Sequence, residues 1–294
     1  MNNESNNFNT LVEQAMHNPE FAHMRPVIEK ELLHYDILYC MEQSGLLEEL
    51  VFQGGTCLRL CYGANRFSED IDFAGGQKFS GQQLTQMKQC IEDYLGNRYG
   101  LEVKVKEPGK QHKPEDTEIK IDRWQVSVVT APERKELPAQ RIRIEIAGVP
   151  AHTRRTASLR SNYDFLPDGY EHTLIYAETP DEIMADKLVS LPATQKYVRY
   201  RDIWDLVWLK QQGATLQANL VTNKTKDYRL TNFDSLLKQC IASLANNINN
   251  KAFAAEMQRF LPSDVFNRTL KKDKFIDFLE QTLTSLLEEL RSQL

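Results

Sequence analysis

The sequence of 294 residues lacks any apolar run long enough to cross a membrane, since a spanning helix needs about 18 or more consecutive apolar residues. Its first residues, Met1–Asn7, are polar and carry neither the basic nor the apolar region of a secretory signal peptide. Internal repeats, low-complexity tracts and a flexible linker are absent as well. We therefore expect a cytoplasmic protein with no membrane partner.

Cysteine is scarce, and its number is odd. The five cysteines stand at scattered positions, which are Cys40, Cys57, Cys61, Cys90 and Cys240. This pattern does not suit a disulfide framework and indicates reduced thiols in the core. Cys57 and Cys61 are one helical turn apart, but no nearby histidine completes a zinc site.

An excess of positive charge is also missing. The formal net charge is -5, which excludes a protein that is basic over its whole surface and binds nucleic acid in that way. The content of 41% hydrophobic and 26% charged residues is that of a soluble globular protein. Basic residues gather in three stretches, 152–160, 187–210 and 267–274. Each stretch alone is typical of a solvated surface, and only clustering around one cleft would make it a binding site.

The chain is organised around a strand, a glycine turn and a short helix. The apolar run that ends at Phe52 is followed by Gly54, Gly55 and Thr56. Glycine allows a sharp turn and a close approach of a ligand to the backbone. Thr56 then stands at the start of a helix, where free N–H groups form a site for an anion such as phosphate.

Two carboxylates follow on a second strand. Asp70 and Asp72 alternate with Ile71 and Phe73, so the two carboxylates are expected on one face of the strand. Carboxylates together with substrate phosphates are the ligands that Mg²⁺ prefers. A glycine turn and a surface pair of aspartates without a ligand is the alternative interpretation.

These two motifs in this order resemble the signature of the nucleotidyltransferase superfamily, which is glycine followed by serine or threonine, a spacer, and Asp-x-Asp. The fuller wording is similar to the AbiEii/AbiGii toxin family of abortive-infection and toxin–antitoxin systems. The residues that carry this resemblance are Gly54-Gly55-Thr56-Cys57-Leu58-Arg59 and Arg66-Phe67-Ser68-Glu69-Asp70-Ile71-Asp72. The resemblance implies an α/β (α+β) nucleotidyltransferase-like mixed sheet with flanking helices, followed by a C-terminal helical bundle.

A third carboxylate is expected on a neighbouring strand. In the stretch 141–146 the isoleucines face a core, so Arg141, Arg143 and Glu145 share the other face. The resemblance implies that Glu145 joins Asp70 and Asp72 as a ligand of Mg²⁺ or Mn²⁺. An ordinary half-exposed strand with a charged face is the alternative.

Two further motifs lie beyond residue 178. Thr179 and Glu182 form a capping box at the start of a helix on which Lys187 lies beside an apolar stripe. Lys187 then either extends its stem over the core or holds its amine over a triphosphate. The spacing of Ile183 to Lys187 matches a family motif, and the resemblance favours the second role.

The segment that follows has the pattern Arg-x-x-Asp-x-x-Asp, at Arg199, Asp202 and Asp205. On a helix these residues lie on adjoining turns, where the alternative is a salt-bridged surface worth about 0.3–0.5 kcal/mol per pair. The family has the same motif, and we expect Asp202 to pair with Lys187 or to orient a substrate group.

The expected elements are given by range. Residues 1 to 24 are polar and expected to be loosely held. Helices are expected at 26–45, from Ser80 to Leu95, from Thr179, and at 233–245, 251–260 and 274–290, and strands at 101–105, 117–130, 140–147 and 172–176. The resulting domains are a nucleotidyltransferase core at 1–178 and a helical domain at 179–294.

The resemblance implies transfer of a nucleoside monophosphate from an NTP to an acceptor, which for several family members is the 3′ end of tRNA, with inhibition of growth. It also implies a cognate antitoxin. The expected catalytic residues are Asp70, Asp72, Glu145, Lys187 and Asp202. The expected substrate-binding residues are Gly54, Gly55, Thr56, Arg66, Ser68, Arg143, Arg199 and Asp205. The alternatives are a non-catalytic nucleotide- or partner-binding module and an enzyme that nucleotidylates protein.

Ser68 is expected on the same strand face as Asp70 and Asp72. A phosphoryl group there would add about -1.5 to -2 charges beside the carboxylates. The hypothesis is that modification of Ser68 inactivates the protein, and the alternative is a turn serine with a local hydrogen bond.

Overall fold

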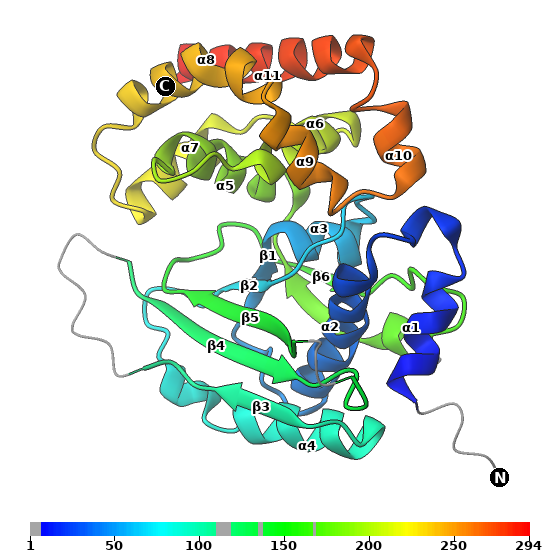
Figure 1. Ribbon diagram of the computed structural model, residues 1–294. Helices are drawn as coiled ribbons and strands as arrows, with labels where there is room; N and C mark the ends of the chain where they lie inside the picture. The colour runs from blue at the N-terminus through cyan, green and yellow to red at the C-terminus, as the bar shows by residue number, and fades with distance from the viewer. Residues whose placement is uncertain (1–6, 110–118, 135–137, 167–168) are drawn as a thin grey trace. The chain divides into compact units, whose positions relative to one another are not determined.

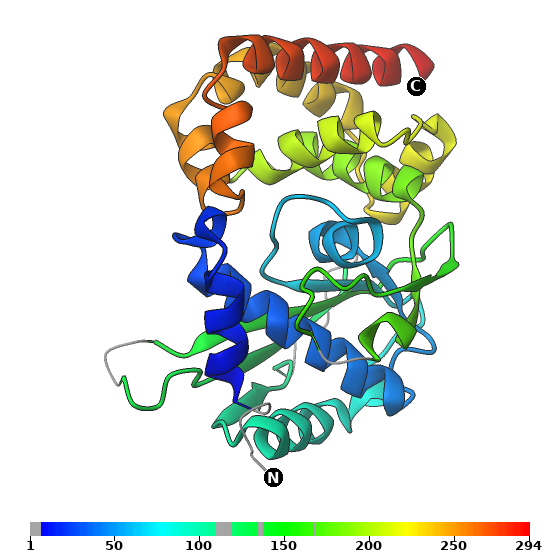
Figure 2. The same ribbon diagram turned by 90° about the vertical axis from the view of Figure 1, so that its right-hand side faces the viewer.

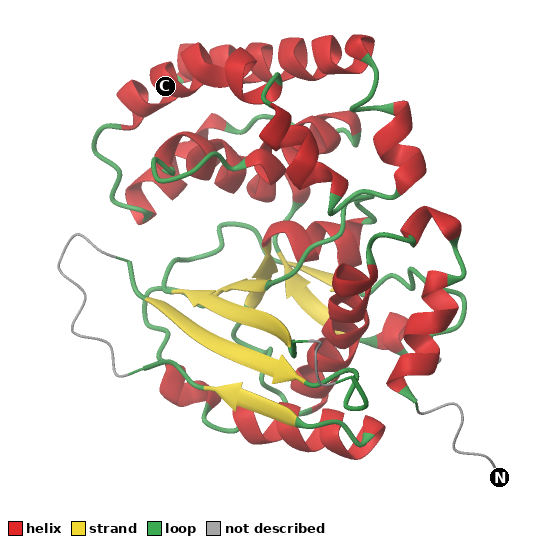
Figure 3. Ribbon diagram, in the orientation of Figure 1, coloured by secondary structure: helices red, strands yellow, loops and turns green. Residues whose placement is uncertain are grey.

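The computed structural model of the protein describes residues 7–109, 119–134, 138–166 and 169–294. The chain divides into two compact units, Met1–Ala177 and Glu178–Leu294. Figure 3 shows that the strands belong to the first unit, whereas the second unit, which is described throughout, consists of helices and loops. None of the helices in the described ranges combines the length and hydropathy of a membrane span.

The first unit contains a sheet and its flanking helices. Its helices are α1 (Phe8–Met16), α2 (Arg25–Gln43), α3 (Gly54–Tyr62) and α4 (Met87–Tyr99), with short 3-10 turns η2 (Pro19–Phe21), η3 (Gly81–Leu84) and η4 (Tyr170–His172). Its strands are β1 (Val51–Gln53), β2 (Ile71–Ala74), β3 (Val103–Lys106), β4 (Ile121–Val128), β5 (Gln140–Ala147), β6 (Arg155–Ser158) and β7 (Leu174–Ala177). Figure 1 labels the helices α1–α4 and the strands β1–β6.

The described strands form one seven-stranded mixed sheet in the order β3-β4-β5-β2-β1-β7-β6. The pairs β1–β7 and β2–β5 are parallel, and the other neighbours are antiparallel. Helix α3 packs against β1 and β2, α2 against β5, and α4 against β3. The mixed sheet with flanking helices, followed by C-terminal helices, confirms the fold class expected from the sequence.

One face of the sheet is apolar and forms the core. Phe52 of β1 lies beside Phe73 of β2, and Ile144 of β5 lies beside Trp124 of β4. All four side chains are buried. Because successive side chains of a strand point to opposite faces, the alternate positions of the same strands form a second face. That second face carries the polar residues of the candidate site.

The second unit is helical: α5 (Pro180–Ala193), α6 (Tyr200–Gln211), α7 (Ala218–Asp227), α8 (Phe233–Ile248), α9 (Lys251–Gln258), α10 (Ser263–Arg268) and α11 (Asp273–Gln293). Helices α8 and α11 lie side by side, as Figure 2 also shows. The buried residues of α11 recur every three or four positions, which is the spacing of an amphipathic helix: Leu279, Leu283, Leu286, Leu287 and Leu290.

The expectation that residues 1–24 are loosely held was wrong for the described part of that segment. Helix α1 begins at Phe8, and its side chains at Phe8, Leu11, Val12 and Ala15 are buried. These positions have the i, i+3, i+4, i+7 spacing of a helix that packs by one face. The polar composition of the segment masked this apolar stripe.

Other boundaries also differ from those expected. Ser80 precedes a 3-10 turn, and α4 begins only at Met87. Strand β6 and helices α7 and α10 were not expected individually. Within the long strand expected at 117–130, β4 covers Ile121–Val128, and residues 117–118 lie outside the described ranges.

Candidate active site

The turn between β1 and α3 requires glycine at two successive positions. Gly54 has a φ of 77°, and a Cβ added there would lie 2.7 Å from Asp72 Oδ2. A Cβ at Gly55 would lie 2.5 Å from Arg66 Nη2 and 3.0 Å from Ser68 Oγ. The two glycines therefore leave space for polar side chains of the segment 66–72, and both positions exclude a larger residue.

Thr56 joins the start of α3 to the aspartate segment. Its side chain is buried, and its hydroxyl donates a hydrogen bond to the backbone carbonyl of Asp70. The residue before the helix, Gln53, makes no side-chain hydrogen bond to the first turn. In this structure the Thr56 hydroxyl positions Asp70, and an anion at the helix start would meet backbone N–H groups.

Arg66 and Ser68 pack beneath the turn. Arg66 is 3% exposed and donates through Nη1 to the carbonyl of Phe67 over 2.6 Å, and Ser68 is 7% exposed. The expectation that Ser68 lies on the strand was wrong, because β2 begins at Ile71. The extended pattern of the sequence did not reveal that the segment before Ile71 is a loop whose Arg66 and Ser68 side chains lie against Gly55.

A row of polar side chains crosses the second face of the sheet. Gln53 of β1 pairs with Asp72 of β2, Asp72 with Glu145 of β5, and Glu145 with Arg123 of β4. We call these four residues the polar row. Arg123 Nε lies 3.0 Å from Glu145 Oε1. Because neighbouring strands are about 4.8 Å apart, the row places the Asp72 and Glu145 carboxylates side by side.

Asp70 precedes β2 and pairs with Arg143 of β5. The backbone N–H of Arg143 donates to Asp70 Oδ1 over 3.2 Å, and its Nη2 donates to Asp70 Oδ2 over 2.5 Å. The hydrogen bond to Asp70 raises the pKa of Arg143 most, against the effect of burial. The structure thus places Arg143 against Asp70 and Glu145, and Asp72 beside Glu145.

The chemistry of this group suits a divalent cation. Asp70, Asp72 and Glu145 offer the carboxylate oxygens that Mg²⁺ and Mn²⁺ prefer. The side-chain oxygen of Gln53, in the same row, is buried and accepts no hydrogen bond from the described residues. A cation or its bound water would satisfy that oxygen. The residues present therefore offer the ligand chemistry of a divalent cation, although in this structure the oxygens of these three acids do not all lie within 4.8 Å of one another, as those of Glu178, Glu182 and Asp186 do.

Lys187 and the aspartates of the Arg-x-x-Asp-x-x-Asp motif form a buried cluster within the second unit. Lys187 Nζ lies 2.8 Å from Asp202 Oδ1 and 2.8 Å from Asp205 Oδ2. Arg199 and Ser190 contact the other oxygen of Asp202. The expected pairing of Asp202 with Lys187 is confirmed. The Lys187 side chain is 7% exposed, so its ammonium does not extend to solvent over the core.

Burial alone raises the pKa of Asp202, but the charges of Lys187 and Arg199 outweigh it and hold the pKa below the usual value. Asp202 is therefore ionised in the folded protein at neutral pH. Its role in this structure is to fix the Lys187 ammonium and, through Ser190, to join α5 to α6.

A second buried cluster was not expected from the sequence. Ligand oxygens of Glu178, Glu182 and Asp186 all lie within 4.8 Å of one another, the only such acidic trio among the described residues. Lys224 Nζ of α7 lies 2.7–2.9 Å from one oxygen of each. The ammonium thus holds the place between the carboxylates where a cation would bind. Glu182 and Asp186 are one turn apart on α5, and Glu178 stands four residues before Glu182, just ahead of the helix. This repeated spacing of four is the signal that could have revealed the cluster.

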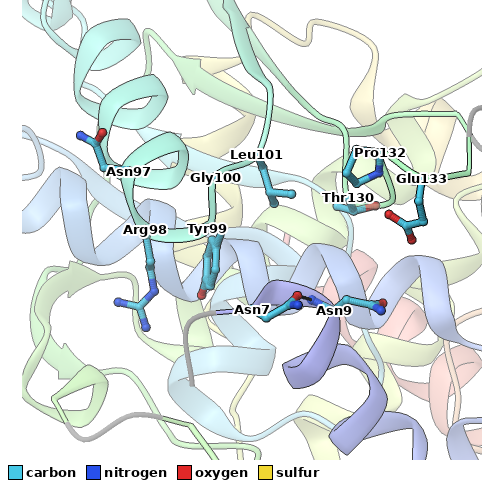
Figure 4. Close-up of a pocket in the computed structure, with 10 residues that line it drawn as sticks. All are labelled: Asn7, Asn9, Asn97, Arg98, Tyr99, Gly100, Leu101, Thr130, Pro132 and Glu133. Carbon is cyan, nitrogen blue, oxygen red and sulfur yellow. Dashed lines mark hydrogen bonds between the residues drawn. The ribbon is translucent and has the colours of Figure 1, made fainter. Parts of the chain in front are cut away.

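One cavity of the described structure is lined by none of the expected site residues. It measures about 820 Å³ and is bordered by Asn7, Asn9, Asn97, Arg98, Tyr99, Gly100, Leu101, Thr130, Pro132 and Glu133. Figure 4 shows these residues, which come from the starts or ends of α1 and α4 and from the loop after β4. Nothing in this lining resembles the carboxylate and glycine arrangement at β1, β2 and β5.

The chain is similar to two solved structures of proteins from Helicobacter pylori. A crystal structure of a candidate nucleotidyltransferase from Helicobacter pylori is 19% identical, covers 90% of this chain and 97% of its own, and has a TM-score of 0.48. The crystal structure of JHP933 from Helicobacter pylori is 18% identical, with 91% and 97% covered and a TM-score of 0.44. A search of curated proteins gave no match.

The family model described as nucleotidyl transferase AbiEii toxin of type IV toxin–antitoxin systems matches residues 36–281. This match includes the glycine turn, the polar row and both motifs of the second unit. The chain belongs to the AbiEii nucleotidyl transferase toxin family.

Proposed function

We propose that this protein transfers a nucleoside monophosphate from an NTP to RNA, at the 3′ end of tRNA, and so inhibits growth. The observation that carries the proposal is the Gly54–Gly55 turn beside Asp70, Asp72 and Glu145, in a chain of the AbiEii family. The reaction is a displacement at the α-phosphorus. An acceptor hydroxyl loses its proton and forms the new P–O bond, while the bond from the α-phosphorus to the oxygen that bridges to the β-phosphate breaks and pyrophosphate leaves. We place it in the cytoplasm, with a cognate antitoxin as partner.

In this proposal, Asp70, Asp72 and Glu145 hold Mg²⁺ or Mn²⁺. When bound, such cations neutralise the charge that develops on the attacking and leaving oxygens. Residues 1–178 form the nucleotidyltransferase core, and residues 179–294 form the helical domain. The N–H groups at the start of α3 bind phosphate, with Gly54 and Gly55 allowing its close approach and Thr56, Arg66 and Ser68 supporting the turn.

Basic side chains are assigned to the phosphates. Arg143 is 56% exposed, so its guanidinium can reach a ligand. We assign Lys187 and Arg199 to neutralising the negative charge of the substrate phosphates. Asp202 and Asp205 would hold these two cations in position. Arginine binds phosphate through paired N–H groups, which gives orientation as well as charge.

The choice of RNA as acceptor is supported by the surface beside the polar row. Leu174 and Tyr176 of β7 are exposed, and they alternate with the buried Ile175 and Ala177. Since Ala177 lies beside the core residue Phe52, Tyr176 faces the same side of the sheet as the polar row.

Arg154 stacks on Tyr176, with its guanidinium carbon 3.4 Å from the ring centroid. Exposed aromatic rings and arginine planes are the groups on which single-stranded bases stack. At about 4.8 Å per strand, β7 lies roughly 10 Å from β2. An RNA end at the carboxylates can therefore continue over this surface.

The test is incubation of the purified protein with each labelled NTP, Mg²⁺ and total RNA, with the protein itself as a second acceptor. Labelled RNA in the tRNA size range is expected, and Asp72→Asn is expected to abolish both the label and growth inhibition. Label on protein instead of RNA would show that the acceptor is a protein. Binding of the nucleotide without transfer of label to either acceptor would show that the protein is a non-catalytic nucleotide-binding module. If the double variant Asp70→Asn/Asp72→Asn inhibited growth as strongly as the wild type, the proposal that growth inhibition results from enzymatic activity would be wrong.

A further inference from the structure

Arg143 contacts the carboxylates that we assign to the divalent cation. Besides its two hydrogen bonds to Asp70, Arg143 places Nη1 4.0 Å from Glu145 Oε1. One guanidinium thus bridges a carboxylate that precedes β2 and a carboxylate on β5. These two groups come from segments that are far apart in the sequence, so the bridge depends on the parallel β2–β5 pairing.

The third carboxylate, Asp72, follows Asp70 by two residues and pairs with Glu145 between β2 and β5. The guanidinium of Arg143 therefore lies against two of the three carboxylates, and the third is one strand spacing from Glu145. A divalent cation held by these carboxylates would be attracted to the same place.

The side chain of Arg143 is also free to leave that place. It is 56% exposed, and exposed ion pairs are weak compared with the attraction between a doubly charged ion and several carboxylates. It covers no apolar core, because the core face of β5 is formed by Ile142, Ile144 and Ile146. Its displacement costs little packing.

We propose that Arg143 is an exchangeable counter-ion, which neutralises Asp70, Asp72 and Glu145 in the metal-free protein and moves to the triphosphate when a divalent cation enters. The first half of this exchange concerns the protein and the cation alone. The second half rests on the proposed function, because it requires an NTP as the ligand.

The first experiment measures Mn²⁺ binding to the nucleotide-free protein by isothermal titration calorimetry. Arg143→Gln is expected to bind Mn²⁺ about tenfold more tightly than the wild type, since the competing charge is gone, and tenfold is about 1.4 kcal/mol. Arg143→Lys retains a charge without the planar fork and is expected to fall between the two.

Arg141→Gln is the matched control. Arg141 is exposed on the same face of β5, two residues earlier, and contacts no carboxylate among the described residues. Its affinity for Mn²⁺ is expected to stay within twofold of the wild type. An unchanged or weaker affinity in Arg143→Gln, or an equal gain in Arg141→Gln, would overturn the inference.

The second experiment measures binding of a non-hydrolysable NTP analogue at saturating Mn²⁺. Arg143→Gln is expected to weaken it severalfold, so that one substitution moves the two affinities in opposite directions. An unchanged analogue affinity would disprove the transfer of Arg143 to the phosphates. Neither measurement depends on turnover, so a protein that transfers no nucleotide would refute the proposed function and still decide the exchange of cation for arginine.

Discussion

The ammonium of Lys187 is enclosed by two buried aspartates, and this position determines what its removal would do. Lys187→Met keeps the length of the side chain but leaves Asp202 and Asp205 without their shared cation. Removing one partner of a buried ion pair costs about 3–5 kcal/mol. We expect this loss of unfolding free energy in urea denaturation of the variant.

Lys238→Met is the control for that variant, because Lys238 pairs with Asp234 on an exposed surface of the same unit. Its effect is expected to remain within about 0.5 kcal/mol. Lys187→Met with wild-type stability and lost activity would instead place the ammonium on substrate alone.

His34 makes stability depend on pH. Burial lowers its pKa from 6.5 to about 4, and its Nε2–H donates to the carbonyl of Glu69 over 3.0 Å. Above pH 6.5 the ring is neutral in both states and contributes no pH dependence. As the pH falls below 6.5, the unfolded chain gains a proton that the folded protein does not bind, so stability falls until about pH 4.

The expected loss from this group between pH 7.5 and 5 is about 2 kcal/mol, at about 1.4 kcal/mol per pH unit. Urea midpoints at the two pH values measure it, and His34→Gln is expected to lose less than the wild type. The exposed His17→Gln should keep the wild-type dependence. Equal pH dependence in all three proteins would show that His34 is not the group responsible.

At the scale of elements, we predict that RNA binds to the exposed surface formed by Arg154 and by Leu174 and Tyr176 of β7. Tyr176→Ala is expected to weaken binding of a fluorescent single-stranded RNA, since loss of one base–aromatic stack costs about 1–3 kcal/mol. Tyr176→Phe keeps the ring and should bind as the wild type does. Fluorescence anisotropy measures both, and equal affinity in Tyr176→Ala would exclude this surface as the path of the acceptor.

The sequence predicted elements well where local chemistry decides them. The turn at Gly54 and Gly55 needs glycine for both its φ and its space, and the alternation in β5 follows directly from its isoleucines. Helix α1 was missed because four apolar side chains in a polar segment are a weak local signal, although they pack fully in the fold.

Contacts between distant segments explain the rest. No local pattern states that β2 pairs in parallel with β5, and this pairing is what sets Arg143 against Asp70. The Lys224 cluster likewise joins residues 46 positions apart. The carboxylates of the candidate site and Arg143 were named from the sequence, whereas the pairing of Arg143 with Asp70 and of Arg123 with Glu145 was seen only in the structure.

At the scale of the whole molecule, the two units provide separate reporters of unfolding. Trp124 lies in the first unit, and Trp204 and Trp208 lie in the second. Lys224→Met is expected to lower the transition seen by Trp204 and Trp208, since the buried Glu182 loses its cation, a cost of about 3–5 kcal/mol. The transition of Trp124 should be unchanged.

The experiment uses two backgrounds, Trp124→Phe and Trp204→Phe/Trp208→Phe, and follows fluorescence in urea. A common shift of both transitions would show that the units unfold as one cooperative body.

Burial and neighbouring acids raise the pKa of Glu178 well above its usual value. Glu178→Gln resembles the protonated form, so this variant should be at least as stable as the wild type at neutral pH.

The position of Lys224 also sets an order for synthesis on the ribosome. All seven strands of the described sheet have been made once Ala177 has been made, so the first unit can fold while the rest is still being translated. The three acids at the start of the second unit must wait for α7, because their cation comes 46 residues after Glu178. A chain that stops before α7 would thus have a folded sheet, whereas the acids at the start of α5 would lack their cation. Limited proteolysis would then cleave the second unit of this chain before the first.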